Sequence, residues 1–135
     1  MIAILDYGSG NLRSALRAFE RAGKDVLLTS DYKVALEAEG LVVPGVGAFG
    51  ACMQGLKEVR GDELVRERFS QSRPTLGICV GMQIFFAHGV EHGSHDGVGI
   101  WPATVEKLEA KVLPHMGWNT VQIHGDSKLF KGVES

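Results

Sequence analysis

The stretch LGICVGMQ, residues 76–83, decides the fold predicted for this chain. The apolar run before it predicts a strand, and a helix is expected to begin directly after Cys79. Gly77 and Gly81 stand two positions to either side of this cysteine, the spacing of a nucleophile elbow with cysteine in place of serine. Glycine suits both positions because the strand and the helix pass too closely for side chains. We therefore expect Cys79 to be exposed at the carboxyl end of a strand, where open α/β sheets bind ligands.

Apolar runs and helical patterns alternate along most of the chain. Near-continuous apolar strands between helices are typical of a mostly parallel sheet covered on both faces. After Gly89 the pattern changes, and the later strands are expected to be antiparallel additions. The expected strands are residues 2–5, 25–29, 41–44, 75–78, 97–108 and 117–123, and the expected helices are residues 12–22, 32–38, 51–59, 62–71 and 81–89.

Length and composition favour a single α/β domain over residues 1–135. The formal charge of −2 gives no basic surface for a nucleic-acid partner. No apolar run approaches the roughly 20 residues that span a bilayer, and the N-terminus lacks the basic region of a signal peptide. The two cysteines show no C-x-x-C spacing, which favours free thiols in a reducing compartment. We therefore expect a cytoplasmic protein without a nucleic-acid or membrane partner.

The stretch VVPGVGAFG, residues 42–50, contains G-x-G-x-x-G after an apolar run, as a dinucleotide-binding turn does. Such a turn is followed about 20 residues later by an acidic residue at a strand end. Residues 69–74, FSQSRP, supply none. The glycines have a second interpretation, because an attacked carbonyl needs N–H donors for its oxyanion. Val80 N–H is one candidate, and the flexible run from Gly45 to Gly47 can supply another. The simplest alternative is an ordinary tight turn.

The thiol of Cys79 would lie at a helix N-terminus, where free N–H groups stabilise the attacking thiolate. A buried core thiol is the alternative, and it is the interpretation that we favour for Cys52. The charge-rich segment RGDELVRERF, residues 60–69, is interpreted as a solvated helix face. The histidines of HGVEHGSHDG, residues 88–97, are interpreted as part of a solvated loop, with no metal site. Trp101 is assigned to packing.

Four segments in this order, DYGSGN, VVPGVGAFG, LGICVGMQ and PHMGWN, resemble class I glutamine amidotransferases. Within that family they look most similar to the glutaminase subunits of imidazole glycerol phosphate synthase, from histidine biosynthesis. The resemblance implies a flavodoxin-like sheet, no cofactor, and hydrolysis of glutamine to glutamate and ammonia. The ammonia would pass to a (β/α)₈ cyclase subunit. By position it implies Cys79 as nucleophile, Gly45, Val46 and Val80 in the oxyanion region, Gly47 and Gln83 at glutamine, and Asn11, Pro114, Met116, Trp118 and Asn119 at the cyclase.

The sequence departs from the family in one respect. The family's histidine and glutamate follow in a late H-x-P-E segment, and the 135 residues contain none. We therefore expect the chain to be an N-terminal portion of the family domain. We also expect these 135 residues by themselves to have reduced activity, because the general base is missing. Two alternatives stay open: a noncatalytic flavodoxin-like module that binds a nucleotide or phosphate, and a thiol hydrolase of the α/β-hydrolase type acting on esters.

Overall fold

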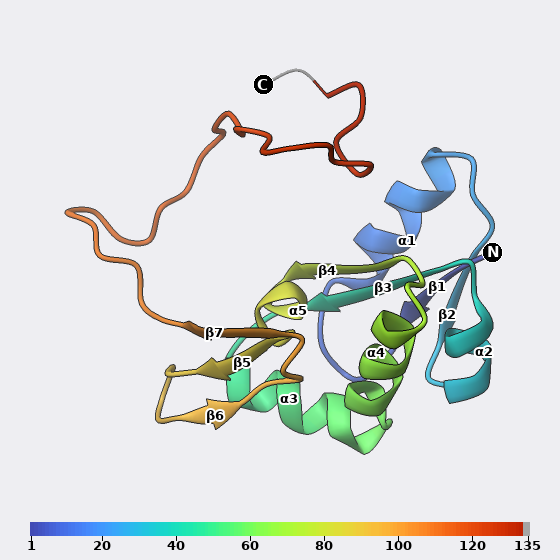
Figure 1. The fold of residues 1–135 in the computed structure, drawn as a ribbon, viewed down its shortest axis with the longest axis horizontal. Helices are drawn as coiled ribbons and strands as arrows, with labels where there is room; N and C mark the ends of the chain where they lie inside the picture. The colour runs from blue at the N-terminus through green and yellow to red at the C-terminus, as the bar shows by residue number, and fades with distance from the viewer. Residues whose placement is uncertain (134–135) are drawn as a thin grey trace.

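The computed structural model describes residues 1–133 and contains two sheets (Figure 1). The larger sheet has four strands, all parallel, as predicted. Its strands are, in spatial order, β2 (Val26–Thr29), β1 (Ile2–Leu5), β3 (Gly40–Gly45) and β4 (Thr75–Cys79). Because the strands are parallel, β3 and β4 end together, with Gly45 opposite Cys79.

Helices lie on both faces of this sheet, which confirms the predicted architecture. Figure 1 shows α1 on one side and three other helices on the opposite side. The bounds are α1 (Leu12–Arg21), α2 (Tyr32–Glu37), α3 (Phe49–Glu58) and α4 (Gly61–Ser70). A further single turn, α5 (Val80–Gln83), follows β4 directly.

The main core lies between the sheet and helices α2, α3 and α4. Strands β1 and β3 are buried almost throughout, which explains why they are continuously apolar rather than alternating. Alternate strand residues such as Leu5 and Val43 join one cluster with Phe49, Leu56 and Leu64. This core fixes the carboxyl ends of β1, β3 and β4, from which the candidate site is built.

The smaller sheet corrects two expectations. Its strands are β6 (His95–Asp96), β5 (Phe86–Gly89) and β7 (Trp101–Val105), in that order. The predicted helix 81–89 is wrong, because α5 ends at Gln83 and Phe86–Gly89 form β5, which pairs with β7. A Cβ on Gly89 would lie 2.5 Å from the Phe49 ring, so tertiary packing helps to define this strand. The later strands are also not all antiparallel: β5 pairs antiparallel with β6 but parallel with β7.

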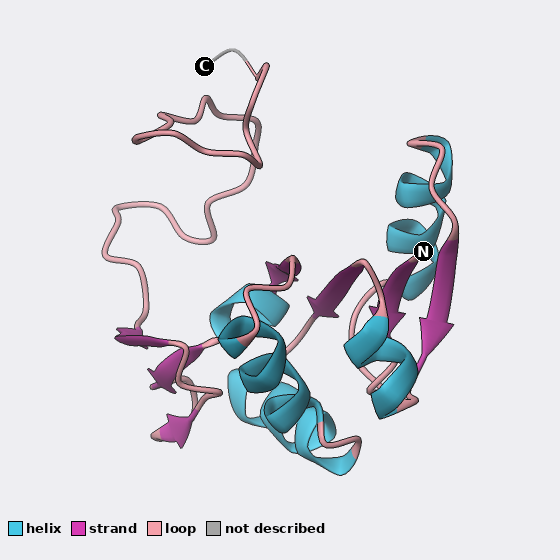
Figure 2. Cartoon of the chain, turned by 45° about the vertical axis from the view of Figure 1, so that its right-hand side comes forward, coloured by secondary structure: helices cyan, strands magenta, loops and turns pink. Residues whose placement is uncertain are grey.

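Residues 106–133 form no helix or strand (Figure 2). The strand expected at residues 117–123 is therefore wrong, since this segment pairs with no strand in the described part of the chain. Trp118 is fully exposed. By contrast, Trp101 contacts the rings of Phe69, Phe85 and Phe86, in agreement with its predicted packing role.

The charge-rich segment 60–69 forms a solvated face as expected, with the exception of Arg68, which is fully buried. Its guanidinium donates to the carbonyl oxygens of Ala35, Leu36 and Ala38 at 2.7–2.9 Å. It also donates to the Pro74 carbonyl at 2.8 Å. Burial, with Arg73 nearby, lowers the pKa of Arg68. The side chain thus joins α4 to the end of α2 and the start of β4.

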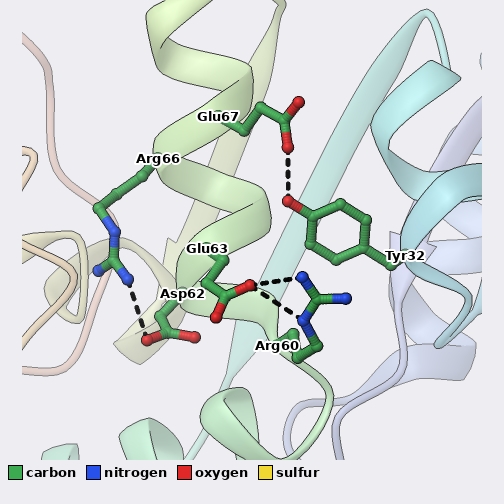
Figure 3. Close-up of polar contacts among 6 residues, drawn as sticks. All are labelled: Tyr32, Arg60, Asp62, Glu63, Arg66 and Glu67. Atoms are coloured by element: carbon green, nitrogen blue, oxygen red, sulfur yellow. Dashed lines mark hydrogen bonds and ion pairs between the residues drawn. The ribbon is translucent and has the colours of Figure 1, made fainter.

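The outer face of α4 carries ion pairs among the charged residues of this segment (Figure 3). Arg60 pairs with Glu63 at 2.7 Å and lies 4.6 Å from the centre of the Tyr32 ring. The Tyr32 hydroxyl donates to Glu67 at 2.5 Å. Burial and this hydrogen bond raise the pKa of Tyr32 to about 12. Tyr32 therefore links α2 to α4 as a neutral donor.

None of the helices within residues 1–133 has the length and apolar character needed to cross a membrane.

Candidate active site

Cys79 is the last residue of β4 and directly precedes α5. Its backbone has φ 57° and ψ −124°, a conformation that is strained for a residue with a side chain. The thiol is free and the residue is exposed. Within the described residues it forms no hydrogen bond to another side chain. A strained turn that exposes a thiol between strand and helix is the geometry expected of a nucleophile elbow.

The glycines around Cys79 are explained by close packing. A Cβ on Gly77 would lie 2.5 Å from Met82 Cα, and one on Gly81 would lie 1.9 Å from the Val43 carbonyl oxygen. These contacts are with backbone, which side-chain rotation cannot relieve. The crowding expected from the G-x-C-x-G spacing is therefore confirmed.

The end of β3 packs directly on the first turn of α5. A Cβ on Gly45 would lie 2.5 Å from Gly81 N and 3.0 Å from the carbonyl carbon of Val80. Gly45 is also the partner of Cys79 in the strand register. The arrangement brings Gly45 and Val80 beside the nucleophile candidate. Their role as oxyanion donors stays a prediction.

Val46, the third oxyanion candidate, has an N–H that is already engaged. It donates to Ser9 Oγ at 3.1 Å. The Val46 carbonyl oxygen lies 3.1 Å from Ser9 Oγ and 3.1 Å from Cys52 Sγ. Gly47, predicted to contact glutamine, follows with φ +85° and no atom within 4 Å of an added Cβ. Glycine is favoured at position 47 because of this positive φ, since an added side chain would not clash with another residue.

Tyr7 contacts the same region, the end of β3. Its hydroxyl donates to the Pro44 carbonyl oxygen, one residue before Gly45. Burial, together with Cys52, raises the pKa of Tyr7 well above its ordinary value, so it remains a neutral donor. Cys52 itself is 2% exposed, in agreement with the expected packed thiol, but its contact with Val46 was not foreseen.

Gln83 stands one helical turn after Cys79 and lines a pocket of about 500 Å³. Glu91 lines the same pocket, and its Oε2 accepts from Phe49 N at 3.4 Å. The other lining residues are Val90, His92, Val105, Glu106 and Lys107. Sequence reasoning missed Glu91 because it stands in a segment interpreted as a solvated loop. In the sequence, Glu91 could have been noticed as an acidic residue eight positions after Gln83.

The predicted partner residues are exposed but are not gathered into one described cluster. Asn11 accepts a hydrogen bond from Ser14 N at 3.2 Å and so caps the N-terminus of α1. Pro114, Met116, Trp118 and Asn119 lie in the segment without regular structure, with Met116 86% exposed. No hydrogen bond within residues 1–133 joins Asn11 to that segment.

The histidines of residues 88–97 make local contacts. His88 Nδ1 lies 3.0 Å from Asp96 Oδ1, across the pairing of β5 with β6. His95 Nε2 lies 3.2 Å from the His92 carbonyl oxygen. The described residues contain no group of three or more His, Cys, Asp or Glu side chains able to hold a metal ion.

A parallel α/β sheet with an exposed cysteine at a glycine-flanked elbow is the arrangement expected of an α/β domain that carries a cysteine nucleophile. The sequence matches the glutamine amidotransferase class-I family over residues 3–135, and the chain belongs to this family. A solved structure described as a glutamine amidotransferase has a TM-score of 0.65, with 22% identity, and the match covers 78% of this chain and 55% of that chain. This likeness supports the fold.

Curated relatives add a more particular similarity. The chain is 62% identical over 135 residues to imidazole glycerol phosphate synthase subunit HisH of Corynebacterium diphtheriae, a match that covers 99% of this chain. It is 56% identical to the proteins of the same name from Streptomyces avermitilis and Mycobacterium tuberculosis, with 99% and 98% of this chain covered. The chain spans 64%, 63% and 65% of the lengths of these three relatives.

Proposed function

We propose that this chain forms the cysteine-bearing part of the glutaminase subunit of imidazole glycerol phosphate synthase. The observation that carries the proposal is the exposed Cys79 at a strained elbow, in register with Gly45. Family membership and the names of the curated relatives support the same assignment.

In the proposed reaction, the Cys79 thiolate attacks the side-chain amide carbon of glutamine. The amide oxygen becomes an oxyanion that accepts hydrogen bonds from Val80 N–H and from an N–H of the Gly45–Gly47 run. The C–N bond then breaks, and nitrogen leaves as ammonia after gaining a proton. Water hydrolyses the resulting thioester, which releases glutamate and restores the thiol. The proton carrier of the family, the histidine of H-x-P-E, is absent from these 135 residues.

The pocket beside Gln83 supplies groups suited to an amino-acid substrate. The Glu91 carboxylate would pair with the α-ammonium group, and the Gln83 amide would donate to or accept from the substrate. Lys107, which follows β7 and also lines the pocket, offers a cation for the α-carboxylate. Backbone at Gly47 would complete the contact with glutamine.

The proposed partner is the (β/α)₈ cyclase subunit, which would join the ammonia to a phosphorylated ribulosyl-carboxamide nucleotide. Asn11 and the exposed segment around Trp118 are the proposed contact surface. An exposed tryptophan suits this role because large aromatic side chains are frequent anchors of protein interfaces. The reaction would take place in the cytoplasm.

A glutamine-like chloroketone tests the nucleophile. The reagent should alkylate Cys79, and free glutamine should protect the thiol by competing for the same pocket. Cys52 should stay unmodified because it is 2% exposed. Cys79→Ala should abolish labelling, and Cys52→Ala is the matched control that should retain it.

Peptide mapping by mass spectrometry gives the result. Labelling of Cys52 before Cys79, or labelling of Cys79 that glutamine does not slow, would contradict the proposal. A protein that ignores the chloroketone yet binds inorganic phosphate would instead support the phosphate-binding alternative. Turnover of simple esters would support the thiol-hydrolase alternative.

A further inference from the structure

Helix α3 begins without a capping side chain of its own. Its N-cap residue is Ala48, whose methyl group cannot accept from the free N–H groups of the first turn. An acceptor comes instead from another part of the chain, because Glu91 Oε2 accepts from Phe49 N at 3.4 Å. A carboxylate suits this place, since the N-terminus of a helix carries partial positive charge. Glu91 therefore caps α3 and at the same time lines the pocket beside Gln83.

The β5–β6 hairpin, residues 86–96, carries Glu91 and packs on the same turn of α3 through His95 (Figure 1). A Cβ on Gly50 would lie 2.8 Å from two atoms of the His95 ring and 3.0 Å from a third, so the ring occupies the space that glycine leaves. His95 Nε2 also lies 3.2 Å from the carbonyl oxygen of His92, the residue after Glu91. Packing of this ring accounts for the last glycine of the G-x-G-x-x-G spacing.

Apolar packing joins the hairpin to the start of α3 as well. A Cβ on Gly89 would lie 2.5 Å from the Phe49 ring, and one on Gly97 would lie 3.1 Å from it. Phe49 is buried in the core, so its ring cannot move aside easily. The first turn of α3 is therefore the surface on which the hairpin rests, and a change in the contact between His95 and Gly50 is expected to move Glu91.

We propose that Gly50 and His95 are positioning residues through which Glu91 recognises the α-ammonium group of the substrate. This inference rests on the proposed function, which pairs the Glu91 carboxylate with that group. The carboxylate is shared: Oε2 accepts from Phe49 N–H, and Oε1, 3.8 Å from His92 Nε2, is left for a cation in the pocket. The packing of His95 on Gly50 keeps the hairpin in the position that allows both contacts. It thereby sets the preference for substrates with a free α-ammonium group.

Two chloroketones that differ in one group report on this recognition. The glutamine-like chloroketone carries the α-ammonium group, and the second reagent is the same molecule without its α-amino group. Both alkylate Cys79 by the same chemistry, and both keep the carboxylate that Lys107 would bind. The ratio of their two rates, which we call the ammonium preference, therefore isolates the contact with Glu91. Iodoacetamide carries neither charged group and monitors the exposure of the Cys79 thiol.

The unmodified protein should show an ammonium preference of about tenfold, the lower end of the range for a hydrogen bond to a charged group. Glu91→Gln, which keeps an oxygen for Phe49 N–H but loses the charge, should abolish it. Gly50→Ala should remove most of it, because the added methyl group displaces the His95 ring by about half an ångström or more. Since a misplacement of about 1 Å can lower a rate about 100-fold, half of it should cost about tenfold. Iodoacetamide labelling should stay unchanged.

His95→Ala should lower the ammonium preference as Gly50→Ala does, because the hairpin loses its packing on α3. The double variant, Gly50→Ala with His95→Ala, should equal His95→Ala alone, since the added methyl group then has no ring to displace. His88→Asn is the matched control. His88 lies on the same hairpin, but its ring pairs with Asp96, so this variant should keep the full preference. Circular dichroism checks that each variant is folded.

An unchanged ammonium preference in folded Gly50→Ala or His95→Ala would overturn the inference, as would a preference that survives Glu91→Gln. Failure of the proposed function looks different, because the unmodified protein would then react with the glutamine-like chloroketone no faster than with chloroacetone. In that case hydrogen exchange of the Phe49 amide still tests the positioning of Glu91. Exchange about fivefold faster in His95→Ala, as expected for the loss of one hydrogen bond, supports it, and unchanged exchange overturns it.

Discussion

Substitution of Gly81 by alanine tests whether close packing at the elbow positions the nucleophile. Alanine favours a helix over glycine by about 1 kcal/mol, so helix propensity alone predicts a gain in stability. The structure predicts the opposite, because the added Cβ would lie 1.9 Å from the Val43 carbonyl oxygen and 2.8 Å from the carbonyl carbon of Pro44. These atoms belong to the backbone of β3, a central strand. Either α5 or β3 must therefore move by about 1 Å to restore a normal contact.

The expected cost follows from that displacement. Overpacking of a core costs about 1–3 kcal/mol, and we expect the upper end here because backbone rather than a flexible side chain must shift. The same movement separates Val80 N–H and Cys79 from the end of β3. Since a misplacement of about 1 Å can lower a reaction rate about 100-fold, chloroketone labelling of Cys79 should fall by this order. Iodoacetamide labelling should change little.

Urea unfolding followed by circular dichroism gives the free energy of unfolding, and timed mass spectrometry gives the two labelling rates. Gly23→Ala is the matched control, because no atom lies within 4 Å of its added Cβ and its φ of +74° is the adverse feature. It should lose only about 1–2 kcal/mol and should not affect labelling. Equal stability of Gly81→Ala and the unmodified protein, with unchanged chloroketone labelling, would refute the packing argument.

Three further predictions follow from the described contacts. Arg68→Met should lower the free energy of unfolding by about 2–6 kcal/mol, because the buried carbonyls of Ala35 and Ala38 each lose a donor; urea unfolding measures this, and a loss below about 1 kcal/mol would contradict it. Tyr32 should titrate near pH 12 in ultraviolet absorbance. Because this folded-state pKa lies above the ordinary value of 10, the neutral hydroxyl stabilises the fold below pH 10, and the contribution is lost as the pH rises through 12; an unfolding profile between pH 10 and 12 that Tyr32→Phe leaves unchanged would exclude this role. Trp118→Ala should leave the unfolding curve unchanged, since the side chain is fully exposed, but should weaken calorimetric binding to the cyclase; unchanged affinity would rule out its interface role.

The elbow and the larger sheet could be predicted because their signals are local. Gly77, Cys79 and Gly81 stand at fixed spacing, and the apolar strands around them alternate with helices. Crowding at Gly77 and Gly81 is also a local consequence of a strand that turns at once into a helix. The predicted and observed strands of this sheet accordingly agree to within one residue at each end.

Strand β5 could not be predicted because its signal is not local. The run from Ile84 to Phe86 is apolar and compatible with a helix. This segment forms a strand because Phe86 pairs with Trp101 of β7, fifteen residues later. Glycines distant in sequence also let other parts of the backbone approach it closely. A Cβ on Gly97, for example, would lie 1.9 Å from the Phe86 carbonyl oxygen.

The polar contacts that matter most were also hidden from the sequence. Ser9 lies in a turn whose glycines suggest only flexibility, and its partner Val46 offers backbone atoms that no side-chain pattern reveals. Arg68 looks like one of several charges on a helix, because its acceptors are main-chain carbonyls supplied by other elements. Glu91 stands among histidines and glycines that predict a loop, and only the fold brings it into the pocket of Gln83.

The partners of Arg68 have a consequence for how this protein tolerates change. Four of its five acceptors are carbonyl oxygens, which every amino acid possesses, and the fifth is the Thr75 hydroxyl. Replacement of the side chains at Ala35 or Leu36 would therefore leave the hydrogen bonds to Arg68 intact wherever the new side chain fits. The arginine specifies the path of the chain at the end of α2 but leaves the residue identities there to be set by packing alone.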